Sequence, residues 1–573
     1  MPSLRSAFRT GLALAVIAPV IVAAGALAAQ HEGHAPPARR VDRALKLGTV
    51  KFPNSGAPAA QEPFLRGMAL LHSYEYYDAR AAFQDAERAD PKFALAYWGE
   101  AFTQSQFDWG IEDLPAAQAA LARLAPTRDA RLAMAGNARE RAFGAAIETF
   151  LTEGPLLERA SSFAAAMRTY STEAPDDVEA MAFAARGALY ALRYAPPPER
   201  VRRAEEAIAL AERVVAANPD HPGGVHYLIH ATDSPRFAAK GLAAARAYDK
   251  LAPDADHALH MPSHIFLQLG MWDEVSASNE RAWAASRAWV ARGGHPVSAL
   301  GWHSLQWLQY GYLQQGRYRE ARALIDSARA ILDPARPSTA DLAGKPDMQY
   351  AIETLAFQYG AETGRWDAFS RPMPEPAALV RRGSVASSLR ETQMATAAGH
   401  HAAVAAVLGG GDVSTAIEGA RAMREAIESM APQDARRTML AGLAAEIDAL
   451  VARARGDDES AIALLTRVAA TSRDTAIAPL GPPTAIPLSE LLGELLLKAG
   501  HPAEAVTAYE RALTDRPNRS SALLGLARAK ARTGDPTGAS AAYAQLLTNW
   551  KRADRDVAAL SEARAAVRAT VKK

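Results

Sequence analysis

The sequence contains no cysteine. This absence excludes disulfide bonds, thiolate ligands for a metal ion, a cysteine nucleophile and a lipid anchor on an N-terminal cysteine. It also avoids mispairing in an oxidising compartment, which fits an exported protein. Runs of Val, Ile, Thr and aromatic residues are scarce, while Ala, Leu, Glu and Arg dominate. This composition predicts an all-α fold.

An excess of charge of one sign is missing too. The 573 residues include 64 basic and 63 acidic side chains, which gives a formal net charge of +1. Nucleic-acid-binding proteins normally carry a basic stripe, so we expect no nucleic-acid partner. The sequence has no Gly-x-Ser-x-Gly, no His-Glu-x-x-His and no EF-hand loop, and no phosphate-binding lysine follows the glycines at 409–411. No common catalytic motif is therefore present.

The first 28 residues have the order of a secretory signal peptide. Arg5 and Arg9 precede an apolar run at 11–25, and Ala-Leu-Ala at 26–28 forms a small-residue cleavage site. The run is short for a membrane span, although an uncleaved anchor is the alternative. No other segment approaches the length of a transmembrane helix. The mature protein is therefore expected to be periplasmic or secreted, with no transmembrane span after cleavage.

Helical repeats are expected to follow a polar tether at 29–59, which is rich in proline and glycine. Two segments, 60–93 and 486–519, carry small residues where two helices touch, an aromatic residue between them and a proline after the second helix. These residues are Gly67, Ala79, Phe83, Ala86 and Pro91 in the first segment, and Gly493, Ala505, Tyr509, Ala512 and Pro517 in the second.

A glycine in the turn between two helices marks further, degenerate copies. It precedes a packing residue by five positions at Gly270, Gly316, Gly364, Gly411, Gly456, Gly500 and Gly534. Glycine relieves the strain of a positive φ at the end of a helix. We expect an α-solenoid of roughly ten or eleven helical hairpins. Its parts are N-terminal repeats at 60–187, central repeats at 188–335 and C-terminal repeats at 336–573.

From about residue 60 to 553 the chain resembles the tetratricopeptide repeat superfamily. More narrowly, His226-Tyr-Leu-Ile-His230 followed by His260-Met-Pro-Ser-His264-Ile-Phe resembles a group of exported bacterial repeat proteins. The superfamily resemblance implies a concave groove, lined by the first helix of each repeat, that usually binds peptides or partner proteins. It does not imply catalysis.

Histidines repeat at the period of this family. His226 and His260 are 34 residues apart, as are His230 and His264, and 34 residues is the length of a tetratricopeptide repeat. In the register that the resemblance implies, seven side chains face the groove. They are His226, His230, His257, His260, His264, His303 and Asp233.

The spacing of these histidines is that of a helical metal site. Residues four apart project from the same face of a helix, so His226 with His230, and His260 with His264, are candidate metal ligands. Neutral imidazole suits zinc or copper, and Asp233 is placed to complete or to orient the ligand set. Pro262 disturbs this geometry, because proline either begins a helix or kinks it.

We expect an exported solenoid that binds a partner protein, a peptide or a small ligand through a histidine-rich pocket. One alternative is a metal-dependent hydrolase or oxidase that uses the same pocket. Another is an assembly scaffold in which the histidines are incidental. His72 is expected to join the cluster only if the array of repeats curls. The sequence gives no indication of the oligomeric state.

Overall fold

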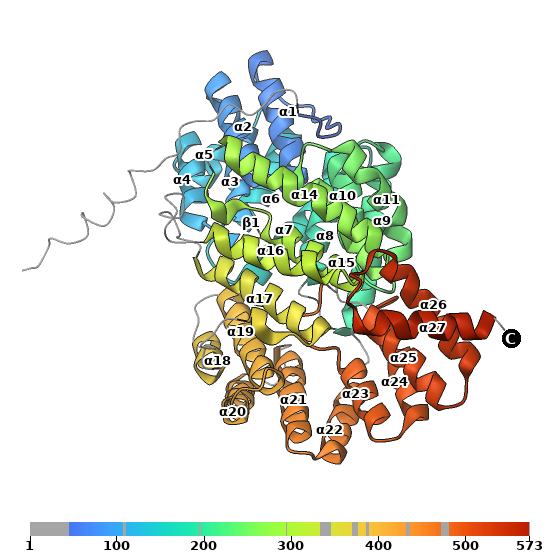
Figure 1. Cartoon of the computed structure of the whole chain (residues 1–573). Coiled ribbons are helices and arrows are strands. Elements are labelled where there is room, and N and C mark those ends of the chain that lie inside the picture. The colour runs from blue at the N-terminus through green and yellow to red at the C-terminus, as the bar shows by residue number, and fades with distance from the viewer. Residues whose placement is uncertain are drawn as a thin grey trace, which may run out of the picture. The chain divides into compact units, whose positions relative to one another are not determined.

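The computed structural model describes residues 45–106, 111–193, 195, 197–293, 295–332, 345–369, 376–384, 389–430, 436–471 and 481–571. The signal peptide expected at 1–28 and most of the expected tether lie outside these residues. The described part is an all-α solenoid of consecutive antiparallel helices (Figure 1). It includes one short hairpin, β1 (Ser105–Gln106) and β2 (Ile111–Glu112), in antiparallel pairing.

The helices that precede the histidine-bearing hairpins begin at Pro58. They are α1 (Pro58–His72), α2 (Tyr76–Ala89), α3 (Ala94–Thr103), α4 (Leu114–Leu124), α5 (Arg128–Ala133), α6 (Ala138–Phe150), α7 (Leu156–Glu173), α8 (Val178–Arg193) and α9 (Pro197–Ala217). The residue pattern expected of a repeat is confirmed in α1 and α2. A Cβ atom at Gly67 would lie 2.8 Å from the Phe83 ring, so the glycine lets the aromatic side chain fill the space between the helices.

The central repeats carry the histidines. Their elements are α10 (Pro222–Thr232), α11 (Ala238–Leu251), α12 (Asp256–His260), α13 (Pro262–Gln268), α14 (Trp272–Gly293), η2 (Val297–Ala299), α15 (Trp302–Gln314) and α16 (Tyr318–Ile331). Helix α10 pairs with α11, α12 and α13 pair with α14, and α15 pairs with α16. The helices α10, α12–α13 and α15 are thus the first helices of three successive hairpins.

The C-terminal repeats complete the array. Their elements are α17 (Lys345–Thr363), η4 (Trp366–Ala368), α18 (Pro376–Ser384), α19 (Leu389–Leu408), α20 (Val413–Ser429), α21 (Arg436–Ala454), α22 (Asp458–Thr471), α23 (Leu488–Lys498), α24 (Pro502–Asp515), α25 (Ser520–Arg532), α26 (Pro536–Asn549), η6 (Trp550–Arg552) and α27 (Ala558–Val571). One continuous core of buried apolar side chains extends from α14 to α27.

Glycines with positive φ end the first helix of several hairpins, as the sequence predicted. They include Gly270 at 64°, Gly316 at 68° and Gly500 at 87°. The prediction was one residue off in the turn after α19, where Gly410 rather than Gly411 has the positive φ, 74°. The neighbouring glycine offers the same freedom, so the sequence alone does not distinguish the two positions.

Hydrogen bonds between helices that are far apart in sequence show that the array of repeats curls. Trp272 Nε1 donates to the Asn518 carbonyl at 2.7 Å, and the Ser520 amide donates to Gln314 Oε1 at 2.8 Å. At the other end of the array, α1 packs on α10. The packing of α1 on α10 brings the first repeat to the histidine-bearing helices.

Residues 45–57 have no regular secondary structure and pack against the repeats. The Lys46 amide donates to Asp254 Oδ2 at 2.6 Å, and the Thr49 amide donates to the Asp220 carbonyl at 2.8 Å. Leu47 and Phe52 are buried. This part of the segment therefore belongs to the packed structure. Among the described residues, no helix combines the length and apolarity needed to cross a bilayer.

Candidate functional site

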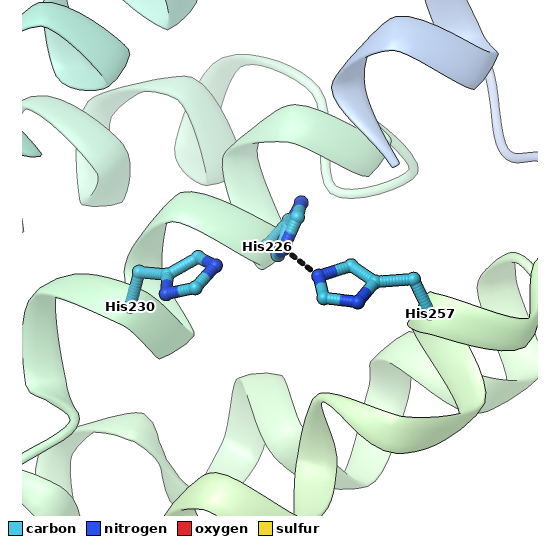
Figure 2. A group of neighbouring side chains, drawn as sticks. All are labelled: His226, His230 and His257. Carbon is cyan, nitrogen blue, oxygen red and sulfur yellow. Dashed lines mark hydrogen bonds between the residues drawn. The ribbon is translucent and has the colours of Figure 1, made fainter. Parts of the chain in front are cut away.

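Six histidines of the central repeats form two adjoining groups. The first set is His226, His230 and His257, from α10 and α12, and it is drawn in Figure 2. The second set is His260, His264 and His303, from α12, α13 and α15. Within each set, one ligand nitrogen from each imidazole lies within 4.8 Å of the others. Three imidazoles at this spacing are a candidate metal site.

Local sequence fixes the start of α10 and so the direction of its two histidines. Pro222 is in the first turn, where its missing N–H costs nothing, and His221 caps the helix. The Gly224 amide donates to His221 Nδ1 at 3.0 Å. One helical turn separates His226 from His230, and their ring centroids are 4.7 Å apart. In Figure 2 the rings of the first set converge on one region.

Pro262 begins a helix without spoiling the histidine geometry. Helix α12 ends at His260 and α13 begins at Pro262. Met261, between them, keeps helical angles, with φ −53° and ψ −36°. Because the backbone stays in the helical region, His260 and His264 remain on one face. Their Nε2 atoms are 3.0 Å apart.

An acceptor atom holds the Nδ1 side of three of these rings. His226 Nδ1 donates to the His72 carbonyl at 2.7 Å, His260 Nδ1 to Asn279 Oδ1 at 2.6 Å, and His264 Nδ1 to Asp233 Oδ2 at 2.7 Å. A carbonyl or carboxylate only accepts, so the proton of each neutral ring is on Nδ1. The Nε2 atom of each ring then carries a lone pair, as a metal ligand requires.

These three acceptors are themselves fixed. His72 is the last residue of α1, and the last carbonyls of a helix have no partner within the helix. Asn279 Nδ2 donates to the Val275 carbonyl at 2.8 Å, which turns Asn279 Oδ1 toward His260. Gln268 Nε2 donates to the second oxygen of Asp233 at 2.9 Å. Asp233 therefore orients His264 and does not complete either set.

Burial keeps four of the six rings uncharged. It lowers the pKa of His226, His257, His260 and His303 well below the usual range, and the neighbouring imidazoles lower it further. These four rings are therefore neutral at pH 7 and can act as ligands. His230, His257, His264 and His303 are only partly buried, so each set is partly accessible to solvent.

One large aromatic side chain packs on each set. The Tyr74 ring centroid is 4.4 Å from His226, 5.6 Å from His230 and 5.5 Å from His257. The Trp307 ring lies 5.4 Å from His260, 5.0 Å from His264 and 4.1 Å from His303. Tyr74 also has a positive φ of 59°, which is uncommon for a residue other than glycine, in the turn that ends α1.

A third group, His72, Glu179 and His221, is a closed hydrogen-bond network. His72 Nε2 donates to Glu179 Oε2 at 3.0 Å and His221 Nε2 donates to Glu179 Oε1 at 2.9 Å. Tyr227 donates to His72 Nδ1 at 2.8 Å. Although burial by itself would raise it, the two imidazoles hold the pKa of Glu179 below its usual range. Every ring nitrogen has a protein partner, so this group is structural.

A pair of carboxyl groups lies beside the first set. The His257 amide donates to Glu75 Oε1 at 3.1 Å, and the Glu75 side chain is hydrogen-bonded to Asp256. Burial and the charge of Asp256 raise the pKa of Glu75 well above its usual range. These groups hold the start of α12 against the start of α2.

Residues 491–558 match the tetratricopeptide repeat family. This segment spans most of α23 and reaches the start of α27. No curated protein matches the chain. A solved structure of the human IFIT1 dimer with PPP-AAAA is similar at 10% identity, over 86% of this chain and 91% of that chain, with a TM-score of 0.34. The TPR domain of P58(IPK) is similar at 12% identity, over 83% of this chain and 98% of that chain, with a TM-score of 0.19.

The structure brings all six predicted histidines and Asp233 together, and it keeps each predicted pair while adding one histidine to it. His226 and His230 join His257, while His260 and His264 join His303. His72 reaches the cluster because the array curls. Sequence reasoning missed Asn279, Tyr74 and Glu179. Their contacts link separate helices, and no local pattern marks them.

Proposed function

We propose that this chain binds two transition-metal ions, one in each three-histidine set, with zinc or copper as the ions. The observation that supports it best is the pair His260 and His264. Both rings have their proton on Nδ1, and their two Nε2 lone pairs face each other at 3.0 Å. Two lone pairs at this distance repel each other unless a cation lies between them.

That cation is either a proton or a metal ion. A proton on His264, with Asp233 as its counter-ion, would be shared by only two nitrogens, the Nε2 atoms of His260 and His264. A metal ion takes a third ligand, and His303 supplies one, since its ligand nitrogen lies within 4.8 Å of the other two. Two nitrogens bound tetrahedrally to zinc are about 3.3 Å apart, close to the spacing of His260 and His264. The third imidazole therefore favours a metal ion.

Element analysis and metal titration of the whole protein test this proposal. We expect two ions per chain, and none when His226, His230, His260 and His264 are changed to alanine. A milder variant, His230→Ala with His264→Ala, removes only half-buried rings and should weaken both sites. His501→Ala is the matched control, because the side chain of His501 is 55% exposed and outside the cluster. A chain that binds neither zinc nor copper would contradict the proposal.

The same site supports an alternative activity as a metal-dependent hydrolase or oxidase. Three imidazoles leave one coordination position open, and a bound zinc ion brings the pKa of a water molecule near 7. Turnover of ester or phenol substrates by the zinc- or copper-loaded protein, lost in the four-alanine variant, would establish an enzyme. Metal binding without turnover would leave a binding or storage role.

We also propose that the repeats bind a protein or peptide partner after export to the periplasm or medium. Tetratricopeptide-type repeats present extended binding surfaces, and residues 491–558 match that family. The test is co-purification from the cell envelope, followed by titration of the purified partner against the pure protein. Cell fractionation and N-terminal sequencing test export. A protein retained whole in the cytoplasm, or one that binds no partner, would contradict this part.

A further inference from the structure

The two histidine sets are in direct contact with each other. His230 of the first set packs on His264 of the second, with ring centroids 6.0 Å apart, and His257 packs on His260 at 5.9 Å. Asp233, the residue that follows α10, bonds to His264 on α13. The helix that supplies two ligands of the first set therefore also supplies the carboxylate that orients the second. The two sets form one packed cluster.

No described carboxylate beside the cluster is available as a further ligand. Both oxygens of Asp233 accept hydrogen bonds, from His264 and from Gln268. Glu75 accepts from the His257 amide and is bonded to Asp256. The ligands of both sets are neutral imidazoles, and each set leaves a coordination position open. A ligand that fills these positions must come from solution.

The charges around the two metal sites indicate which kind of ligand they would bind. Asp233, Glu75, Asp256 and Glu179 carry at most four negative charges, which at most equal the four positive charges of two divalent ions. The charge of Arg186 lowers the pKa of His226, and the charge of Arg193 lowers the pKa of His303. Both arginines therefore add positive charge near the cluster. Buried positive charge of this size needs a counter-ion. The site therefore favours an anion.

The indole N–H of Trp307 gives an independent indication. Trp307 is 6% exposed and touches all three rings of the second set. Its Nε1 atom is a buried donor with no acceptor among the described residues. A buried donor without a hydrogen-bond acceptor lowers stability by about 1–3 kcal/mol, so we expect the N–H to have an acceptor in the native protein. An anion on the second metal ion would be an acceptor beside this ring.

We propose that the two metal ions together bind one small anion, which also accepts the Trp307 N–H. This inference rests on the proposed function, since it requires both ions. The partly buried rings of each set leave it partly accessible from solution. Azide is a suitable probe, because it bridges metal ions through its two ends and gives an absorption band on copper(II).

The test is an azide titration of the copper-saturated whole protein, followed by absorbance. We expect one azide per two copper ions. In Trp307→Phe, which keeps a ring but removes the N–H, azide affinity at copper saturation should fall about tenfold. A one-set chain, with His264→Ala and His303→Ala, should bind azide at least tenfold more weakly, because only one ion remains. Trp550→Phe is the matched indole control, since Trp550 is buried and its Nε1 also has no acceptor among the described residues.

The outcomes separate the inference from the proposed function. Two copper ions with two independent azides, or an azide affinity that is the same in the one-set chain, would overturn the shared anion and leave the metal sites intact. An unchanged affinity in Trp307→Phe would overturn the role of the indole and with it the proposal. A protein that takes up no copper would overturn both the inference and the proposed function.

Discussion

Asp233→Asn should weaken metal binding at the second set alone. Asp233 is 5% exposed and accepts from His264 Nδ1 at 2.7 Å. A carboxylate behind a ligating histidine raises the basicity of the ring, and its loss typically reduces metal affinity 10- to 100-fold. That range is about 1.4–2.7 kcal/mol. We expect the upper half of it, because the carboxylate is buried and water screens it little.

The substitution keeps the shape of the site. Asparagine can turn its oxygen to His264, and Gln268 can turn its own amide to match the new NH₂ group. The variant therefore removes a negative charge and leaves the hydrogen bonds in place. The zinc or copper affinity is best measured by calorimetry in two backgrounds. One has only the second set, through His230→Ala and His257→Ala, and the other has only the first set, through His264→Ala and His303→Ala.

Asp233→Asn should lower the affinity in the chain that retains the second set and leave the affinity of the other chain unchanged. Asp515→Asn is the matched control, because it makes the same chemical change on the surface of α24, where Asp515 pairs with Arg511. Equal losses in both backgrounds would show a general effect of charge. No loss in either background would refute the orienting role of Asp233.

Three further predictions concern stability in the metal-free protein. Gly223→Ala places a Cβ atom 2.6 Å from His72 Nδ1 and should lower the free energy of unfolding by about 1–3 kcal/mol, measured with denaturant. His221→Gln removes a cap and one bond to Glu179, so stability should fall by about 1–3 kcal/mol while two ions still bind; the loss of one ion would contradict a structural role. Burial lowers the pKa of His401 to about 3, so its unfolded form gains a proton first as pH falls below about 6.5. Stability should therefore fall toward pH 4, by at most about 1.4 kcal/mol per pH unit from this group, and His401→Gln should remove that part of the slope.

The sequence predicts the helices of the site well because the repeat period is local information. Each histidine of the two motifs sits on the first helix of a hairpin, and the 34-residue spacing places both pairs in equivalent positions. Turn glycines such as Gly316 locate the hairpins independently, since only glycine adopts a positive φ at little cost. The fold class and the two histidine pairs follow from these two signals. His257, His303 and Asp233 were included only through the groove register that the tetratricopeptide resemblance implies.

The division into two sets depends on distances between helices, which the period does not contain. His257 precedes His260 on the short helix α12, yet its ring turns toward α10 and lies 5.0 Å from His226. The acceptors behind the rings are equally remote. His72 is 154 residues from His226, and it reaches α10 only because the array curls.

Pro262 shows how a local rule can hold while its expected consequence fails. Proline removes one backbone hydrogen bond, and the helix does end before it and restart at it. The arrangement of metal ligands, however, depends on the directions in which the side chains project from the helix and not on an unbroken series of backbone hydrogen bonds. Because Met261 keeps helical angles, the relative directions of His260 and His264 are preserved.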